Sequence, residues 1–151
     1  MSSIITIIES VVNDIPSKPN FIHGQKGWQN VESDESAFPA VYLDEPITSD
    51  DTFHQGGLVE ETYPLQMMFL DKTELRQTPE QLRPTVDAMR ELRRQFVLRL
   101  KAKKNANGEH IFKEITNVRT IDVYNVFDVN ISGVIITFNA KPLNSDSVCV
   151  S

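Results

Sequence analysis

The longest periodic pattern in the chain lies between residues 78 and 104, where apolar side chains recur every three or four positions. This spacing predicts an amphipathic helix, because it places the apolar side chains on one face. The positions that share this face are Leu82, Val86, Met89, Leu92, Phe96 and Leu100. The face needs a partner layer, so the helix is expected to cover a sheet.

Both ends of this helix carry recognisable signals. Thr78 followed by Gln81 predicts a capping box, and Pro79 suits the first helical turn, where a missing N–H costs no hydrogen bond. Pro84 predicts that a short first turn precedes the main helix. Residues 105–108 contain two asparagines and a glycine, which predict the end of the helix.

A second, shorter helix is predicted near the start of the chain, where apolar residues again recur at helical spacing. Its apolar positions are Ile4, Ile8, Val11 and Ile15, with Ile5 and Val12 beside them. Ser2 or Ser3 is placed to cap the helix, and Pro16 is placed to end it. The many β-branched residues make a strand the alternative, but the residues between do not alternate cleanly, which favours the helix.

Alternation of apolar and polar positions predicts the first strands. Residues 38–44 are expected to form one strand, and after a polar loop at residues 46–57 a longer strand spans residues 58–70. The shared apolar face of the long strand comprises Val59, Tyr63, Leu65, Met67 and Phe69. Pro64 interrupts this strand and predicts a bulge or an edge position, because proline donates no ladder hydrogen bond.

Two more alternating runs, at residues 118–129 and 134–142, are separated by a turn at residues 130–133, and this predicts an antiparallel hairpin. One face of the first run carries Ile121, Val123, Phe127 and Val129, and one face of the second carries Val134, Ile136, Phe138 and Ala140. Residues 144–151 are small and polar, so they are expected to form a flexible C-terminal tail.

This order of elements predicts an α+β fold in a single domain that spans residues 1–151. The expected architecture is an antiparallel or mixed β-sheet of about four to five strands, packed against one long α-helix, with a short N-terminal helix. The second face of the sheet also keeps apolar side chains, so a second layer is expected, either the first helix or another subunit. These side chains are Tyr42, Met68, Leu70, Tyr124, Val126 and Ile135.

The segment at residues 17–37 is expected to be mainly loop, although Phe21 and Ile22 have the side chains of a short strand. Loops of this length are usually functional, so the segment is interpreted as a contact segment. Trp28 lies within it. Its side chain either folds back over the edge of the core or anchors a partner, since tryptophan is enriched at interface hot spots.

The net charge of −6 is unevenly distributed. Residues 1–82 carry 14 acids and 4 bases, residues 83–104 carry 2 acids and 8 bases, and residues 105–151 carry 5 acids and 3 bases. The long helix is therefore a basic island in an acidic chain. Pairing with carboxylates of neighbouring strands and loops is one explanation. The other is charge complementarity between identical subunits, which favours docking rate and register more than affinity.

Four basic residues form a ridge along one flank of the long helix, because they are spaced by seven, four and seven positions. They are Arg83, Arg90, Arg94 and Lys101. We interpret the ridge as solvated or paired at an interface, with non-specific contact to DNA as the alternative, since the chain is acidic overall. Arg93 falls near the apolar face. Either its stem packs while its head reaches the helix edge, or this face is partly an intersubunit seam.

The sequence predicts no catalytic site, because it has neither a Gly-x-Ser-x-Gly elbow nor a phosphate-binding glycine loop. Asp50, Asp51 and His54 share one loop, but their spacing matches no strong metal motif, so neither a metal nor a cofactor is expected. The single cysteine, Cys149, cannot form an internal disulfide and favours a reducing compartment. We expect no signal peptide and no membrane span, which needs roughly 20 apolar residues.

Three stretches, in their order along the chain, resemble a known family. They are residues 38–43 (Phe-Pro-Ala-Val-Tyr-Leu), residues 65–70 (Leu-Gln-Met-Met-Phe-Leu) and residues 133–138 (Gly-Val-Ile-Ile-Thr-Phe). With a polar loop after the first and the long helix between the second and third, the chain resembles a bacteriophage tail terminator, also called a tail completion or neck protein. The resemblance covers about residues 1–143.

The resemblance implies a virion structural protein without catalytic residues, which forms a homo-oligomeric ring, commonly a hexamer, at the head-proximal end of the tail tube. Such a ring stops tube polymerisation and joins the tail to the head. The implied partners are further copies of the chain, the tail tube protein and the head–tail connector or neck protein. The implied location is the virion tail or neck, after assembly in the host bacterial cytoplasm.

Two alternatives to a terminator stay open. The first keeps the virion and changes the role to a head–tail connector or minor tail protein of similar fold. The second belongs to another class, a cytoplasmic ligand-binding domain or enzyme that uses the loop with Asp50, Asp51 and His54.

Overall fold

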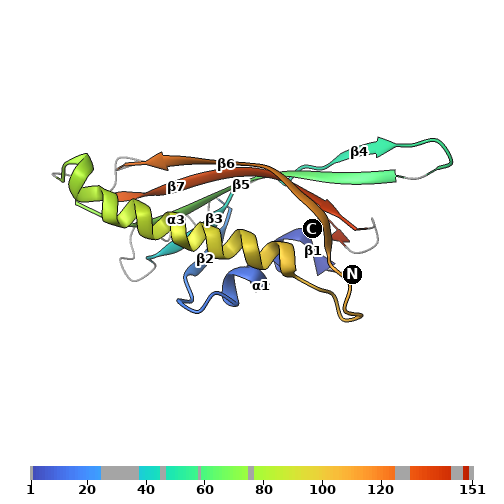
Figure 1. Ribbon diagram of the computed structural model, residues 1–151, viewed down its shortest axis with the longest axis horizontal. Coiled ribbons are helices and arrows are strands. Elements are labelled where there is room, and N and C mark those ends of the chain that lie inside the picture. The colour runs from blue at the N-terminus through green and yellow to red at the C-terminus, as the bar shows by residue number, and fades with distance from the viewer. Residues whose placement is uncertain are drawn as a thin grey trace.

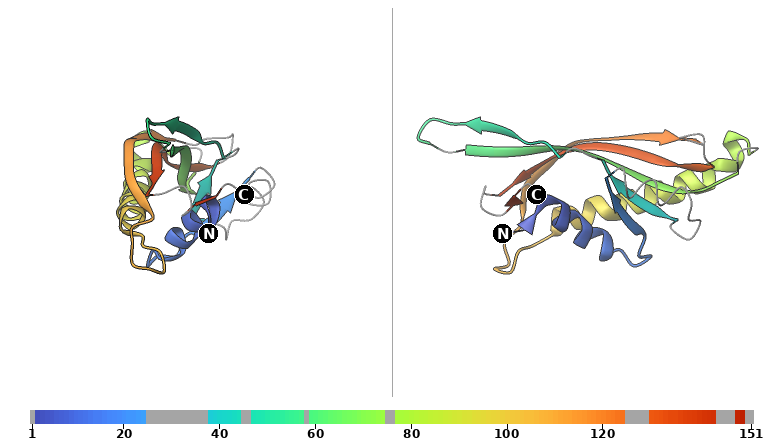
Figure 2. Two further views of the ribbon diagram at one scale, coloured as in Figure 1. Left: turned by 90° about the vertical axis from the view of Figure 1, so that its right-hand side faces the viewer. Right: turned by 180° about the vertical axis from the view of Figure 1, so that it is seen from behind.

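The computed structural model describes residues 2–24, 38–44, 47–57, 59–74, 77–124, 130–143 and 148–149. Their elements are β1 (Ser2–Ser3), α1 (Ile4–Asn13), β2 (Asn20–His23), β3 (Ala40–Leu43), β4 (Asp50–Phe53), β5 (Val59–Lys72), α3 (Pro79–Ala102), β6 (Phe112–Val123), β7 (Ile131–Pro142) and β8 (Val148–Cys149). Six strands form the main sheet in the order β2-β3-β5-β7-β6, with β4 paired to β5 outside this path. Both helices lie on one face of the sheet (Figure 1, Figure 2).

The predicted α+β fold is confirmed, and its sheet is mixed. The neighbours β2 and β3 run parallel, whereas β3, β5, β7 and β6 run antiparallel to one another along the sheet. The sheet contains more strands than expected, because β4 was assigned to a polar loop. A separate two-stranded pairing joins β1 and β8 in parallel, with Ser2 opposite Val148 and Ser3 opposite Cys149. The segment expected to be a flexible tail therefore contains a short strand.

The long helix α3 begins as its sequence predicts. The Thr78 hydroxyl accepts a hydrogen bond from the Gln81 amide at 3.3 Å, and the Gln81 side chain accepts one from the Thr78 amide at 2.9 Å. All six residues of the predicted apolar face are buried. The helix begins at Pro79 and contains Pro84, so the short first turn predicted before Pro84 belongs to the same helix. The helix tolerates Pro84 because the N–H it lacks leaves the carbonyl of only one residue, the exposed Glu80, without a helical donor.

The short helix α1 is also confirmed. The Ser3 hydroxyl caps it by accepting a hydrogen bond from the Thr6 amide at 3.1 Å. Its buried residues are Ile4, Ile7, Ile8, Val11 and Val12, and they belong to the same cluster as the apolar face of α3. Because α1 lies beside α3, the expectation that α1 covers the second face of the sheet is wrong.

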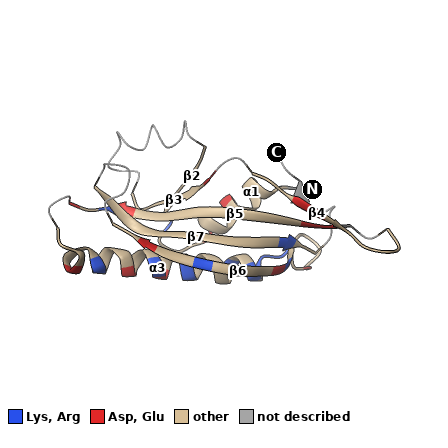
Figure 3. Ribbon diagram, turned by 90° about the horizontal axis from the view of Figure 1, so that it is seen from above, with Lys and Arg blue, Asp and Glu red and all other residues tan. Residues whose placement is uncertain are grey.

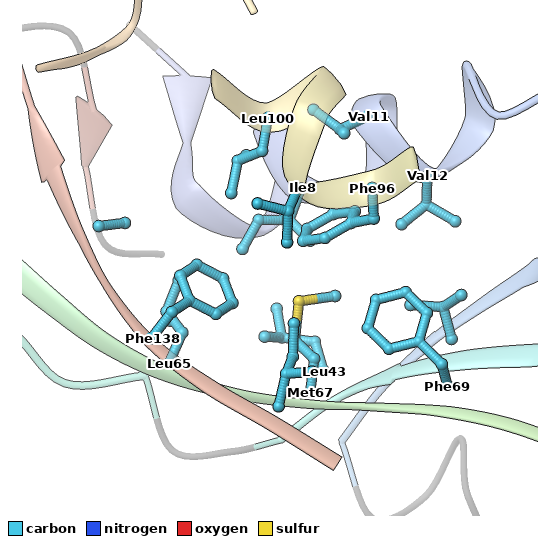
Figure 4. Packing of buried hydrophobic residues seen from close by; sticks show 14 of the residues in the cluster. Ile8, Val11, Val12, Leu43, Leu65, Met67, Phe69, Phe96, Leu100 and Phe138 are labelled. Atoms are coloured by element: carbon cyan, nitrogen blue, oxygen red, sulfur yellow. The ribbon is translucent and has the colours of Figure 1, made fainter. Parts of the chain in front are cut away.

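The main core lies between the two helices and the concave side of the sheet, and Figure 4 shows its centre. Phe96 of α3 occupies this centre. Its ring centroid lies 5.6 Å from that of Phe69 on β5 and 6.3 Å from that of Phe138 on β7. All three rings are almost fully buried. Fully burying a side chain of this size stabilises the fold by about 1.5–3 kcal/mol, so Phe96 fixes α3 across the two central strands.

The second face of the sheet carries a smaller apolar cluster. Its buried members are Ile22, Ala40, Tyr42, Met68, Leu70 and Ile131, with Phe38, Val123 and Ile135 packed against them. The prediction of an apolar second face is thus confirmed at Tyr42, Met68, Leu70 and Ile135. Tyr124 is 42% exposed, and Val126 lies outside the described residues.

Two short strands, β3 and β4, share one side of the long strand β5. There β3 pairs with Met67–Leu70 and β4 pairs with Val59–Thr62. Pro64 lies between these two ladders. The Gln66 carbonyl accepts from the Asp44 amide at 3.0 Å, so the backbone of Pro64, two residues away, faces the same side, where no strand among the described residues pairs with it. The edge interpretation of Pro64 is confirmed, and its register with Asn139 of β7 shows no bulge.

The hairpin of β6 and β7 is confirmed with two corrections. The strand β6 begins at Phe112 rather than at residue 118, and its register shifts between Thr116 and Arg119. These shifts interrupt the alternation that sequence patterns depend on. Ile121 is 45% exposed because it lies on the face away from α3. Residues 125–129, which include Phe127 and Val129, lie outside the described residues.

Gly133 was expected in the turn and lies instead within β7, paired with Leu70 and Val123. A Cβ atom at this position would lie 1.9 Å from the backbone oxygen of Phe69. Only glycine fits there without moving a strand.

We expect Gly133→Ala to lower the free energy of unfolding by about 3 kcal/mol or more, since the clashing atom belongs to the backbone and cannot rotate away. Gly108→Ala is the control, because Gly108 has a φ of 80° and open space around its Cα. Its cost of about 1–2 kcal/mol reflects the left-handed backbone alone. Chemical denaturation measures both, and equal losses would contradict the close packing of β5 on β7.

Candidate interaction surface

The flank of α3 that faces β6 carries two of the predicted interface residues, Arg90 and Arg93. Arg90 Nε donates to Asp122 Oδ1 at 2.6 Å, and Arg93 Nε donates to Thr120 Oγ1 at 2.9 Å. Thr120 and Asp122 alternate along β6 and so point to the same side, towards the helix. These two contacts join α3 to the edge strand of the sheet.

Arg93 illustrates how a charged residue fits near an apolar face. Its side chain is half-buried, yet its guanidinium reaches the Thr120 hydroxyl at the edge of the helix. The interpretation in which the stem packs while the head reaches the helix edge therefore holds. Whether this face also meets another subunit stays a prediction.

Arg94 lies on the outer side of α3 and pairs within the helix. Its Nε and Nη2 donate to the two carboxylate oxygens of Glu91, at 2.9 Å and 2.6 Å. A hydrogen bond from Arg94 and, to a smaller extent, one from Gln95 lower the pKa of the Glu91 carboxyl from 4.5 to about 2. Both side chains are at least half exposed, so this bidentate pair adds little stability in water.

The two outermost residues of the ridge, Arg83 and Lys101, are exposed and have no ion-pair partner within the described part of the chain. Lys103, just after the helix, pairs with Asp14 near the end of α1 at 3.3 Å. The basic island is therefore compensated internally at Arg90, Arg94 and Lys103, whereas no acid in the described part of the chain pairs with Arg83 or Lys101. Figure 3 shows that blue Lys and Arg positions recur along α3.

An open depression of about 270 Å³ lies over this flank, and its lining is charged. The lining residues are Asp87, Arg90, Glu91, Arg93 and Arg94. Three guanidinium groups and two carboxylates in an open depression suit a charged protein surface better than a small apolar ligand, which binds in enclosed apolar sites. Trp28, the remaining interface candidate, lies outside the described residues.

The loop proposed as a ligand or metal site has a different structure. Asp50 and Asp51 belong to β4 and, as neighbours in a strand, point to opposite faces. His54 Nε2 lies 3.6 Å from Glu60, whose carboxylate also meets Lys141 at 3.2 Å. A hydrogen bond from Lys141 and, to a smaller extent, one from Lys113 lower the pKa of the Glu60 carboxyl. Across the described ranges, no three His, Cys, Asp or Glu side chains gather where they could hold a metal ion.

The feature that the sequence interpretation missed is a two-stranded arm, formed by β4 and residues 59–62 of β5. It extends beyond the end of α3 (Figure 1; Figure 2, right). All four residues of β4 are exposed, and Phe53 keeps 76% of its surface in solvent. The signal was Gly56-Gly57, both with φ near 90°, between two short polar runs, which is typical of a hairpin turn.

A further depression, of about 370 Å³, lies beside Pro64, where β3 and β4 leave the edge of β5 uncovered. Its polar lining includes Gln66, whose side-chain amide donates to Asp44 at 2.9 Å, together with Asn117, Thr137 and Asn139. Apart from the Asp44 carboxylate, the polar side chains of this lining are amides and a hydroxyl.

No protein-family model and no curated protein matches the chain. No helix in the described part of the chain is long and apolar enough to cross a membrane.

A double-mutant cycle tests the link between α3 and β6. The cycle compares Arg90→Ala, Asp122→Ala and the double variant. We expect a coupling energy of about 0.2–1 kcal/mol, the range of exposed ion pairs. The control cycle combines Arg83→Ala with Asp122→Ala and should give none. Coupling of equal size in both cycles would show that the contact is not specific.

The Arg94–Glu91 pair predicts an acid-dependent effect. The pKa of Glu91 is about 2 in the folded chain and 4.5 ordinarily, so its contribution to stability is present above pH 4.5 and is lost as the pH falls towards 2. In an NMR titration of the folded protein, Arg94→Gln should return the Glu91 pKa towards 4.5, whereas Arg83→Gln should leave it low. An unchanged titration in Arg94→Gln would contradict the pairing.

Proposed function

We propose that this protein is a bacteriophage tail terminator, a virion structural protein that forms a homo-oligomeric ring on the head-proximal end of the tail tube. The ring stops tube polymerisation and joins the tail to the head. The proposal draws on the resemblance of three stretches to that family. The order of helices and strands that the resemblance implies agrees with the fold of this chain. The first two stretches overlap β3 and β5, and the third lies in β7.

The observation that carries the proposal is the arm. None of its β4 residues belongs to either apolar cluster, and all four are exposed, so β4 adds nothing to the core of an isolated subunit. A two-stranded ribbon is only marginally stable in water. An element of this kind is explained by a surface that covers it after assembly.

The edge strand β6 supports the same conclusion. It pairs with β7 on one side, and within the described residues no strand pairs with its other side. Its residues are mostly exposed, and Ile121 and Tyr124 leave apolar surface at one end of it. Long unpaired edges are usually protected in monomers, whereas assemblies use them as contacts.

Light scattering combined with electron microscopy tests the proposal, using the full chain alone and with purified tail tubes. We expect a closed ring in solution or on one end of each tube, together with tubes of fixed length when the protein is present during polymerisation. A protein that stays monomeric and leaves tube ends bare would contradict the proposal. Its position in a particle reconstruction separates a terminator from a head–tail connector or a minor tail protein.

A further inference from the structure

We infer that the arm of one subunit docks on the outer side of α3 in a second copy, where Phe53 packs against Leu98 and acidic residues of the arm meet Arg94 and Lys101. This inference rests on the homo-oligomer of the proposed function and names the surfaces that make it. It begins from exposure: Phe53 at 76% and Leu98 at 52% are the most exposed large apolar side chains in the described part of the chain.

The arm carries acid beside its exposed ring. Asp51 and Phe53 are two residues apart on β4 and share one face, with Glu61 of β5 directly opposite Asp51. Like charges facing each other across two strands destabilise the pair. Neither Asp51 nor Glu61 has an ion-pair partner within the described residues, so an outside cation would relieve this repulsion. Glu60, on the other face, is already held by Lys113 and Lys141.

The outer side of α3 carries the complementary pattern. Arg94, Leu98 and Lys101 are four and three residues apart, so they lie in one stripe with the apolar side chain between two cations. Arg94 and Lys101 are separated by about 10 Å along the helix. Lys101 has no ion-pair partner in the described part of the chain, and Arg94 is more than half exposed despite its contact with Glu91.

The two patterns match in spacing. From Asp51 to Phe53 the strand advances about 7 Å, and from Leu98 to either cation the helix advances about 5–6 Å. Phe53 seated on Leu98 therefore brings Asp51 and Glu61 within reach of a cation on the stripe.

A subunit cannot make this contact with itself, because its arm points away beyond the end of α3 (Figure 2). Arm and stripe are different surfaces, so the contact is head-to-tail, and repetition of such a contact generates a ring when the rotation between neighbours closes. The charge complementarity of this contact fixes the register of neighbouring subunits. The open edge of β6 is available to enlarge the buried area of the interface.

Charge reversal tests the inference on the full chain. Asp51→Lys and Lys101→Glu are each expected to raise the apparent Kd of association about tenfold or more, and the two together in one chain should restore it. The controls are Asp50→Lys, which lies on the opposite face of β4, and Arg83→Glu, which lies about 27 Å from Lys101 along the same helix. Both should leave the apparent Kd unchanged. Circular dichroism confirms folding of every variant. Single variants that assemble normally, or a double variant that gains nothing, would overturn the inference.

A cross-linking experiment separates this inference from the proposed function. In a Cys149→Ser background, Phe53→Cys with Leu98→Cys should oxidise to a ladder of covalent oligomers, while Thr52→Cys with Leu98→Cys, from the opposite face of β4, should not. A ring without cross-links would overturn the arm contact and leave the terminator proposal standing. Cross-linked dimers with no larger species would support the arm contact and overturn the ring. A strict monomer, alone and with tail tubes, would overturn both.

Discussion

The burial of one face of α3 is the constraint on which the rest of the structure depends. Phe96 reaches both central strands at once, with ring centroids 5.6 Å from Phe69 and 6.3 Å from Phe138. The sheet must therefore keep β5 beside β7 in one register, which the close approach at Gly133 enforces. With α1 placed beside α3, both helices are used on the same face of the sheet.

The same constraint explains the arm. Among the side chains of β5 that the structure describes, Tyr63 is the first that is fully buried, and the helices cover the sheet from that point onward. The preceding residues of β5 continue past the core and, within the described residues, pair with β4 alone among the strands. The strand is therefore structural over one part of its length and free for contacts over the other. Assembly is how we propose that a virion subunit uses the free part.

The sequence predicted the elements whose signals are local. The capping box at Thr78, the Ser3 cap and the helical period of α3 depend on neighbours within a few residues, and the structure confirms them. The sequence did not predict the early start of β6, because register shifts interrupt its alternation. Nor did it predict β4, since all four of its residues are exposed and a strand that buries nothing leaves no apolar period.

The candidate interaction surface likewise combines positions that local spacing predicted with contacts that it could not predict. Helical spacing placed Arg90, Arg94 and Lys101 on one flank, but it could not show that Arg90 is already engaged by Asp122 of β6, a contact 32 residues distant in sequence. Nor could it pair Leu98 with Phe53, because exposed apolar residues carry no signal until the fold shows which ones remain uncovered. The helix that organises the core is thus also the helix whose outer side is proposed to receive a neighbour.

A cryo-electron microscopy reconstruction of the assembled full chain, at a resolution that shows side chains, would locate the arm of each subunit relative to its neighbours. We expect a head-to-tail ring in which the Phe53 ring of each subunit lies against Leu98 on the α3 of the next. An assembly in which the arms extend into solvent, or lie against any other surface, would contradict this contact.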